Sequence, residues 1–310
     1  MPSTLSARRI SFWLVLAAVL IVAGAMVGRT ILRSKARRTP VAAYLVPIDN
    51  TGRAKTAWWW SALRLDVPRA LHSGERVSIP AGSSVRLVHA DSGAAELIAG
   101  PTKLFFQQKF PVETNTLVSP LAEVIASAKS SPPQPSDSFV ITSPVGKTRY
   151  LNPLITWTAR DGVMYDIAVV DSADPNVPPR FARSIRPPIA LADLQTPQRR
   201  QLGVDRNYEI IMREANAFRI SGAARFLTAT NAQLENQIPA TPADLISEAA
   251  AAMAKKPYRT GDAWLALTRL PTDWARSELA VRLRLRVAIE LGLADELARA
   301  QKDAAALNAW

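Results

Sequence analysis

One uninterrupted apolar segment constrains this chain more than any other feature of its sequence. Residues 10–28, ISFWLVLAAVLIVAGAMVG, contain no charged residue and no proline. A helix of that length measures roughly 28 Å, which is close to the thickness of the hydrocarbon core of a bilayer. The segment has no polar face at any helical phase, so the alternative of a buried core helix fits it poorly. The sequence therefore predicts a single transmembrane helix, preceded by a short polar tail at residues 1–9.

The same segment has the features of a secretory signal peptide. Arg8 and Arg9 precede the apolar run, and Ala23-Gly24-Ala25 forms an A-x-A cleavage pattern. The run nevertheless continues to Gly28, and a basic stalk at residues 29–40 follows directly. We therefore predict an uncleaved signal-anchor. Cleavage near Ala25, which would give a secreted protein, is the alternative.

The positive charge of the chain is concentrated beside this segment. Residues 1–38 carry +7 and no acidic residue, whereas the rest of the chain carries +5 of the total of +12. Such a flank suits an anionic membrane surface. More charges follow the span than precede it, which favours a cytoplasmic body, but large domains behind a signal-like segment are often exported regardless. The modules that follow favour export, so we expect a single-pass protein of the inner (cytoplasmic) membrane with its bulk in the periplasm. A cytoplasm-facing body is the alternative.

A small β-module is predicted at residues 41–110. Val85 and Leu87 alternate with polar residues, and Ser92-Gly93 stands where a hairpin turn belongs. The order of turn glycines and strands over residues 65–108 resembles the FecR-type β-domain, and this resemblance implies a periplasmic-type module. It does not carry over sigma-factor regulation, because the tail before the span is too short for the cytoplasmic region that family members often have. His89 is in phase with the buried positions, so we expect it to be buried, whereas His72 is expected to be solvated.

A second β-module is predicted at residues 138–230, after a Pro/Ser-rich linker at 111–137 that holds a short helix over Leu121–Ala128. The order S-P-x-G, P-x-x-x-W, then Y-x-[IV]-x-[IV]-x-D resembles the Ig-like or fibronectin type III-like sandwich of bacterial envelope proteins. Trp157, Tyr165 and Tyr208 are interpreted as its core and corner residues. Residues 172–200 are expected to form a long loop.

The chain is predicted to be helical over residues 241–310. Thr241 followed by Pro242 is a helix start. Further helices are expected from Thr260 to about Leu270, from Pro271 to about Leu291, and from Ala294 to Ala306. Their short amphipathic pattern resembles a tetratricopeptide-like hairpin array with too few units to be stable alone, so the segment should pack on the sandwich or on a partner. Arg282, Arg284 and Arg286 are interpreted as a solvated basic stripe.

These segments define the predicted fold class: mainly β with a C-terminal α-helical segment, an N-terminal transmembrane helix, a small FecR-like β-domain, an Ig-like β-sandwich and helical hairpins. Two surfaces are candidates for partner binding. Three consecutive indoles, Trp58, Trp59 and Trp60, cannot all point into one core because strand side chains alternate. They are core and edge residues in one interpretation and an exposed aromatic platform in the other. The pair Arg199-Arg200 lies in the long predicted loop of the second module.

Nothing in the sequence predicts catalysis. There is no cysteine, there are two histidines, and no nucleophile, phosphate-binding or metal-binding motif occurs, so we expect no enzyme, no cofactor and no metal site. The sequence has no basic face with interleaved aromatic residues, so we expect no nucleic-acid partner. Three hypotheses remain: a non-catalytic envelope protein that binds a protein or cell-wall partner, a FecR-like transmembrane regulator acting with a sigma factor or a protease, and an enzyme with an unrecognised site. The first is preferred, because two segments look like binding modules.

Overall fold

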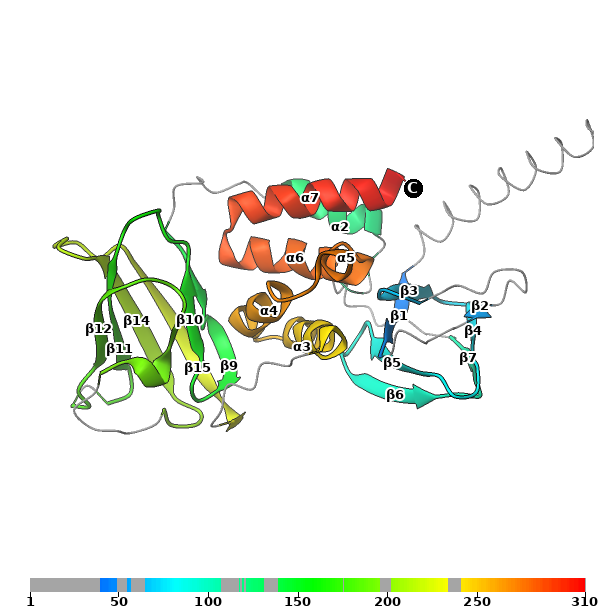
Figure 1. Ribbon diagram of the computed structural model, residues 1–310, viewed down its shortest axis with the longest axis horizontal. Coiled ribbons are helices and arrows are strands. Elements are labelled where there is room, and N and C mark those ends of the chain that lie inside the picture. Colours follow the sequence, from blue (N-terminus) through cyan, green and yellow to red (C-terminus); the bar gives the residue numbers. More distant parts are fainter. Residues whose placement is uncertain are drawn as a thin grey trace, which may run out of the picture.

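The computed structural model describes residues 40–48, 55–56, 65–106, 117, 119, 121–130, 139–174, 176–195, 202–233 and 241–309. It confirms a mainly β chain with C-terminal helices. Three parts follow one another along the longest axis of the molecule: a small β-unit, a helical layer and a larger β-unit (Figure 1). The predicted membrane span at residues 10–28 lies outside the described residues. Within the described ranges, no helix is long and apolar enough to cross a membrane.

The first β-unit, residues 41–106, consists of two small sheets with strand orders β3-β1-β5-β6 and β2-β4-β7. The strands are β1 Val41–Pro47, β2 Lys55–Thr56, β3 Arg69–His72, β4 Arg76–Ile79, β5 Ser84–His89, β6 Ala95–Ala99 and β7 Thr102–Phe105. Leu45, Ile79 and Leu87 belong to the core between the sheets. The hairpin predicted at Ser92-Gly93 is confirmed, because β5 and β6 pair antiparallel on either side of it.

Strand β1 explains how the helices join this unit. All seven of its residues are buried. Leu45 faces the core between the two sheets, whereas Tyr44 and Val46 belong to the core that the helices form. Successive strand side chains point to opposite faces, so a strand buried on both faces lies between two layers. The first sheet is therefore the middle of three layers.

The second β-unit has two sheets with strand orders β12-β11-β14-β15-β9 and β13-β10-β8. Its elements are β8 Ile141–Ser143, β9 Gly146–Tyr150, β10 Leu154–Trp157, β11 Tyr165–Asp171, β12 Arg180–Ile185, β13 Ile189–Ala190, the 3₁₀ turn η1 Leu191–Asp193, β14 Asn207–Glu214 and β15 Gly222–Gln233. Trp157, Tyr165 and Tyr208 are confirmed as core residues. The prediction of one long loop at residues 172–200 is wrong, because β12 and β13 lie within it.

Six helices are described: α2 Leu121–Ser130, α3 Pro242–Ala254, α4 Thr260–Leu267, α5 Thr272–Ala275, α6 Glu278–Leu291 and α7 Ala294–Ala309. The predicted starts and stops are confirmed at Thr241, whose hydroxyl accepts from the Asp244 N–H, and at Gly292, which has a left-handed conformation. The single helix predicted from Pro271 is wrong. It breaks before α6, where the Ser277 side chain accepts from the Ala280 N–H and so begins a new helix.

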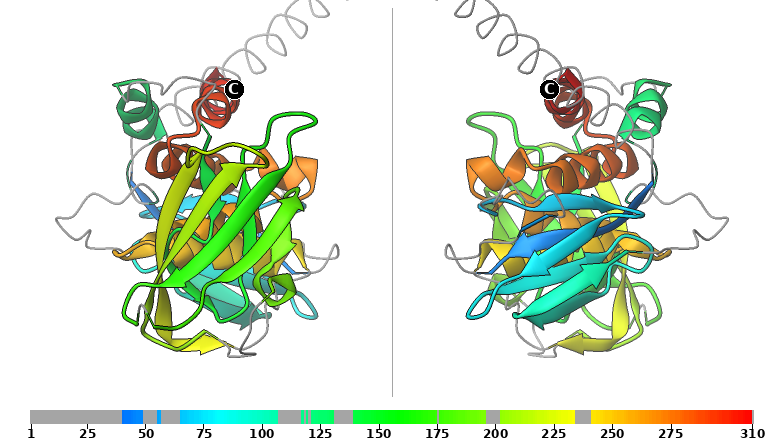
Figure 2. Two further views of the ribbon diagram at one scale, coloured as in Figure 1. Left: turned by 90° about the vertical axis from the view of Figure 1, so that its left-hand side faces the viewer. Right: turned by 90° about the vertical axis from the view of Figure 1, so that its right-hand side faces the viewer.

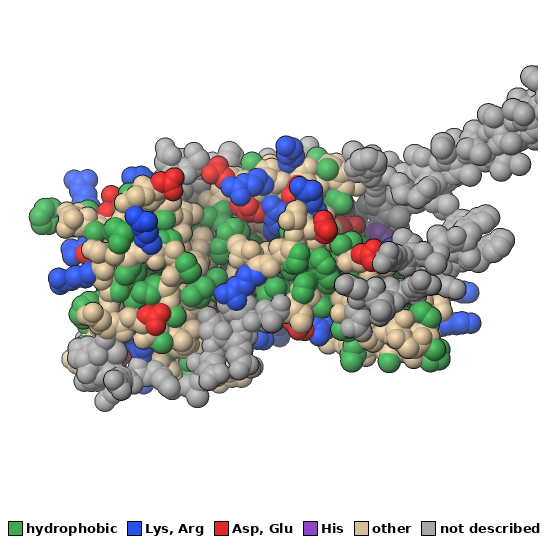
Figure 3. Space-filling model, in the orientation of Figure 1, with side chains coloured by type: hydrophobic (Ala, Val, Ile, Leu, Met, Phe, Trp, Pro, Cys, Tyr) green, Lys and Arg blue, Asp and Glu red, His purple; other side chains and the backbone are tan. Residues whose placement is uncertain are grey.

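Helix α3 connects the helical layer to both β-units. On one side Arg86 of β5 lies 2.5 Å from Asp244. One turn later Glu248 lies 2.8 Å from Arg149 of β9. In both end-on views a β-unit lies in front of the helices (Figure 2), and charged side chains of both signs gather over the helical layer (Figure 3). The helices therefore pack on both β-units, which extends the prediction that they would pack on the sandwich.

Two predictions about burial are wrong. Arg282 is completely buried and Arg284 nearly so, although both were assigned to a solvated stripe. Arg282 meets the Ser119 carbonyl before α2, and Arg284 meets Glu296 and Asp303 of α7, contacts that local periodicity does not reveal. The side chain of His89 is 37% exposed and its Nε2 lies 3.3 Å from Glu96 Oε1. It ends β5 beside β6, whose side chains are mostly exposed, so the alternation stops short of the core.

Candidate binding groove between α2 and α6

The five residues that the sequence singled out as partner-binding candidates, Trp58, Trp59, Trp60, Arg199 and Arg200, all lie outside the described residues. Their role stays a prediction. The described part of the chain offers a different candidate, a groove of about 310 Å³ between α2 and α6. Its lining residues come from α2, from the segment before α2 and from α6: Ser119, Glu123, Val124, Ser127, Ala128, Leu285, Arg286 and Ile289.

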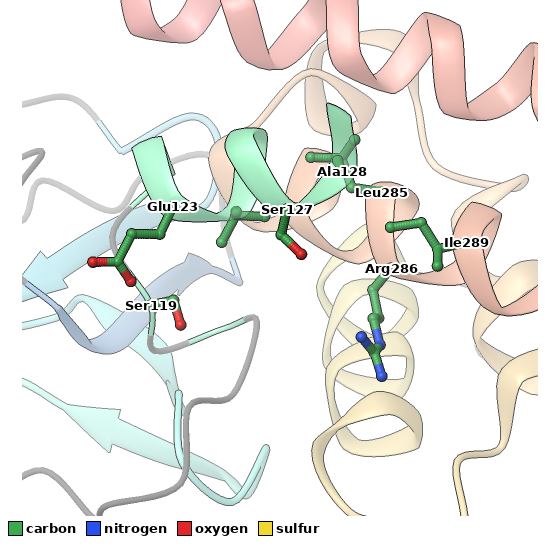
Figure 4. A pocket seen from close by; sticks show the side chains of 8 residues that line it. Ser119, Glu123, Ser127, Ala128, Leu285, Arg286 and Ile289 are labelled. Atoms are coloured by element: carbon green, nitrogen blue, oxygen red, sulfur yellow. The ribbon is translucent and has the colours of Figure 1, made fainter. Parts of the chain in front are cut away.

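Helix α2 forms one wall of the groove because it is amphipathic. Val124, Ile125 and Ala128 are buried against the helical layer, whereas Glu123 and Ser127 are exposed. The Ala128 carbonyl also accepts a hydrogen bond of 2.9 Å from the Gln301 side chain of α7. Figure 4 shows the Glu123 carboxylate and the Ser127 hydroxyl on the groove side of this helix.

Two buried polar side chains fix the segment that leads into α2. Arg282 of α6 donates to the Ser119 carbonyl over 2.5 Å and to Glu278 over 2.7 Å. The Tyr44 hydroxyl of β1 donates to the Leu117 carbonyl over 2.7 Å. Burial raises the pKa of Tyr44 well above its usual value, so the hydroxyl keeps its proton and remains a donor. The groove is thus built on a rigid base that the first β-unit shares with α6.

Arg286 of α6 supplies the positive side of the groove. Its Nη2 lies 2.6 Å from Glu290, and its guanidinium carbon lies 5.3 Å from the centre of the Tyr258 ring. These contacts hold the guanidinium plane in one orientation. Its Nε is buried and has no hydrogen-bond partner among the residues that the structure describes. Glu123 on one wall therefore stands across from Arg286 on the other, whose charge is shared with Glu290 of the same helix, and Figure 4 shows Glu123 and Arg286 on opposite sides of the opening.

The lining defines what the groove can do chemically. A carboxylate on one wall and a guanidinium on the other flank two hydroxyl groups and an apolar surface of Val124, Leu285 and Ile289. The serines that line it have no lining histidine to act as a base. Among the described residues, no group of three or more His, Asp or Glu side chains could hold a metal ion. This composition suits the binding of a segment that carries both charges and small apolar groups.

A second polar cluster joins the helical layer to the larger β-unit. Asp262 accepts from the Thr148 hydroxyl over 2.7 Å, and Arg259 lies 2.6 Å from Glu248 and 3.2 Å from Asp262. Burial raises the pKa of Asp262 to about 6, against the hydrogen bond from Thr148 and the charge of Arg259. The negative charges of Asp262 and Glu248 are balanced by the positive charges of Arg259 and Arg149. The side chain of Asp262 is nearly inaccessible, so the cluster serves to join elements and offers no binding surface.

Sequence reasoning missed the groove because its two walls come from segments far apart in the chain. Glu123 and Ser127 stand four residues apart on the exposed side of α2, and that spacing was the only local signal. Arg286 was noticed, but as part of a solvated stripe. Comparison with known proteins finds no relative. No family model, curated protein or solved structure shows significant similarity to this chain.

Proposed function

We propose that this chain is a non-catalytic binding protein of the bacterial cell envelope, anchored in the membrane by residues 10–28. The groove between α2 and α6 binds a peptide segment of a protein or cell-wall partner. The placement of the Glu123 carboxylate and the Arg286 guanidinium on opposite walls of this groove is the observation that carries the proposal. The resemblances to FecR-type and Ig-like modules support placement outside the cytoplasm.

The groove suits a peptide because peptides offer the complementary groups. An ammonium or guanidinium group of the partner faces Glu123, and a carboxylate of the partner faces Arg286, whose Nη1 donates to it beside the existing pair of Nη2 with Glu290. Small apolar side chains fill the space against Val124 and Ile289. A volume of about 310 Å³ corresponds to a few side chains and not to a whole folded domain.

The proposal is tested by site-specific photo-crosslinking in intact cells. A photoreactive residue replaces Ser127 in the groove, or Lys302 on α7 as the matched position outside it. We expect a discrete crosslinked product from position 127 only. Glu123→Gln in the same chain lowers its yield by about five-fold, the effect of losing an exposed charge contact of about 1 kcal/mol. Equal crosslinking from both positions, or a yield that Glu123→Gln leaves unchanged, contradicts the proposal.

A further inference from the structure

The turn between β14 and β15 exposes apolar side chains that the groove does not use. Phe218 is completely exposed and Ile220 is 63% exposed, and they flank Arg219 in the sequence. Among the described residues the other large exposed apolar side chains, Leu97, Phe105 and Val204, lie on other parts of the fold. We call residues 215–221 the β14–β15 tip. It lies at the end of the molecule opposite β1 (Figure 1).

Backbone hydrogen bonds hold the tip in a defined conformation. The Ala215 N–H donates to the Met164 carbonyl over 2.8 Å, which ties the tip to the turn before β11. The Ala217 N–H donates to the Glu214 carbonyl over 2.9 Å, and the Ser221 N–H donates to the Met212 carbonyl over 2.8 Å. These hydrogen bonds fix a convex turn that presents the Phe218 and Ile220 side chains outward. The exposure of the two side chains is therefore a property of an ordered turn.

The surroundings of the tip are cationic. Two of the nearby acids are neutralised, since Arg213 lies 3.0 Å from Asp166 and Arg160 lies 3.5 Å from Glu214. Arg183, Arg186 and Arg219 form no ion pair within the part of the chain that the structure describes. The sum over these five arginines and three acids, Asp166, Glu214 and Asp161, is a net charge of +2. Figure 3 shows Lys and Arg side chains beside hydrophobic ones along this edge.

We propose that the β14–β15 tip inserts Phe218 and Ile220 into the interface of a bilayer that contains anionic lipids. A convex turn with an apolar end and several arginines nearby matches this surface, which accepts apolar groups beneath a layer of negative headgroups. A protein partner would need a preformed concave pocket to take a fully exposed phenylalanine. The tip gives the molecule a membrane contact that is independent of both the groove and the predicted span.

The test uses a fluorescent probe in the full chain, which has no natural cysteine. Ala217→Cys places an environment-sensitive label in the tip and keeps Phe218 and Ile220, and Ala94→Cys places the same label in the first β-unit as the control. The labelled chains are reconstituted in vesicles of phosphatidylcholine alone or mixed with phosphatidylglycerol. We expect a blue shift and quenching by nitroxide-labelled lipid at position 217 only, and mainly with phosphatidylglycerol present.

Two sets of variants separate insertion from other causes. Phe218→Ser with Ile220→Ser abolishes the quenching, whereas Leu97→Ser with Phe105→Ser leaves it unchanged. Each of Arg183→Gln, Arg186→Gln and Arg219→Gln weakens the contact by about five-fold, since a cation near an anionic surface contributes about 1 kcal/mol. The proposal is overturned if position 217 stays unquenched on phosphatidylglycerol vesicles. It is equally overturned if the blue shift requires an added acidic protein.

Discussion

Arg282 is the residue on which the helical layer depends most directly. It is completely buried, and it donates to Glu278 and to the Ser119 carbonyl. Replacing it by alanine leaves both acceptors without their donor and opens a cavity. We expect Arg282→Ala to lower the free energy of unfolding by about 3 kcal/mol or more in urea titrations. Arg225→Ala, which removes an exposed arginine paired with Glu209, should change it by less than about 0.5 kcal/mol. Similar losses for the two variants would contradict the structural role assigned to Arg282.

Asp262 makes the stability of the molecule depend on pH. Its pKa rises from 3.8 to about 6 on folding, because burial disfavours the charged carboxylate. Between these values the folded state binds more protons than the unfolded state, so the contribution of Asp262 to stability falls as pH rises from about 4 to about 6 and is level above that.

Asp262→Asn removes this titration. We expect the free energy of unfolding of the unmodified chain, measured relative to the Asp262→Asn variant, to fall by on the order of 2–3 kcal/mol between pH 4 and pH 7. Chemical denaturation of both chains across this range measures the difference. A difference that is independent of pH, or that grows as pH rises, would mean that the arginines of the cluster outweigh the burial of Asp262.

At the scale of elements, the β5–β6 hairpin docks on α3 through its turn. Gly93 has φ +64°, and a Cβ at this position would lie 2.6 Å from the Cβ of Ala254. Gly74 also has a positive φ, but a Cβ there would meet nothing within 4 Å. Both alanine variants carry backbone strain, and Gly74 at φ +89° lies farther from the left-handed region than Gly93, so a larger cost at Gly93 comes from the contact with α3. We expect Gly93→Ala to cost about 1–3 kcal/mol more than Gly74→Ala in thermal or urea unfolding. Equal costs would show that the turn of the hairpin does not pack against α3.

The elements differ in how far their sequences predicted them. The β5–β6 hairpin and the start of α3 were predictable because turn and capping residues act locally. Strands β12 and β13 were missed because Arg183, Pro187 and Pro188 interrupt the apolar alternation there. The break before α6 was missed because Ser277 acts as an N-cap inside a continuous helical pattern.

The groove and the burial of Arg282 depend on contacts between segments far apart in the chain. Val124 and Ser127 in α2 face Leu285 and Arg286 in α6, and no local pattern encodes that meeting. The guanidinium of Arg282 is satisfied by a carbonyl and an acid that only the folded chain brings together. Periodicity treats every arginine as exposed, so it could not find either feature.

At the scale of the whole molecule, the helical layer stands between two β-units and contacts both. Asp244 meets Arg86 on one side, while Glu248 and Asp262 meet Arg149 and Thr148 on the other. The groove belongs to the helical layer and the β14–β15 tip to the end of the larger β-unit (Figure 1). The molecule therefore carries its two proposed contact surfaces on different parts of the fold, and we propose that residues 10–28 hold it outside the cytoplasm.

The most direct test of this account is the topology of the chain in the membrane. One reporter that is active only outside the cytoplasm and one that is active only inside it are each fused after Trp310 in the full chain. The account predicts activity from the exported reporter, membrane-bound protein of full length, and loss of that activity when residues 10–28 are deleted. Activity from the cytoplasmic reporter would contradict it, because the groove and the tip would then face the wrong compartment.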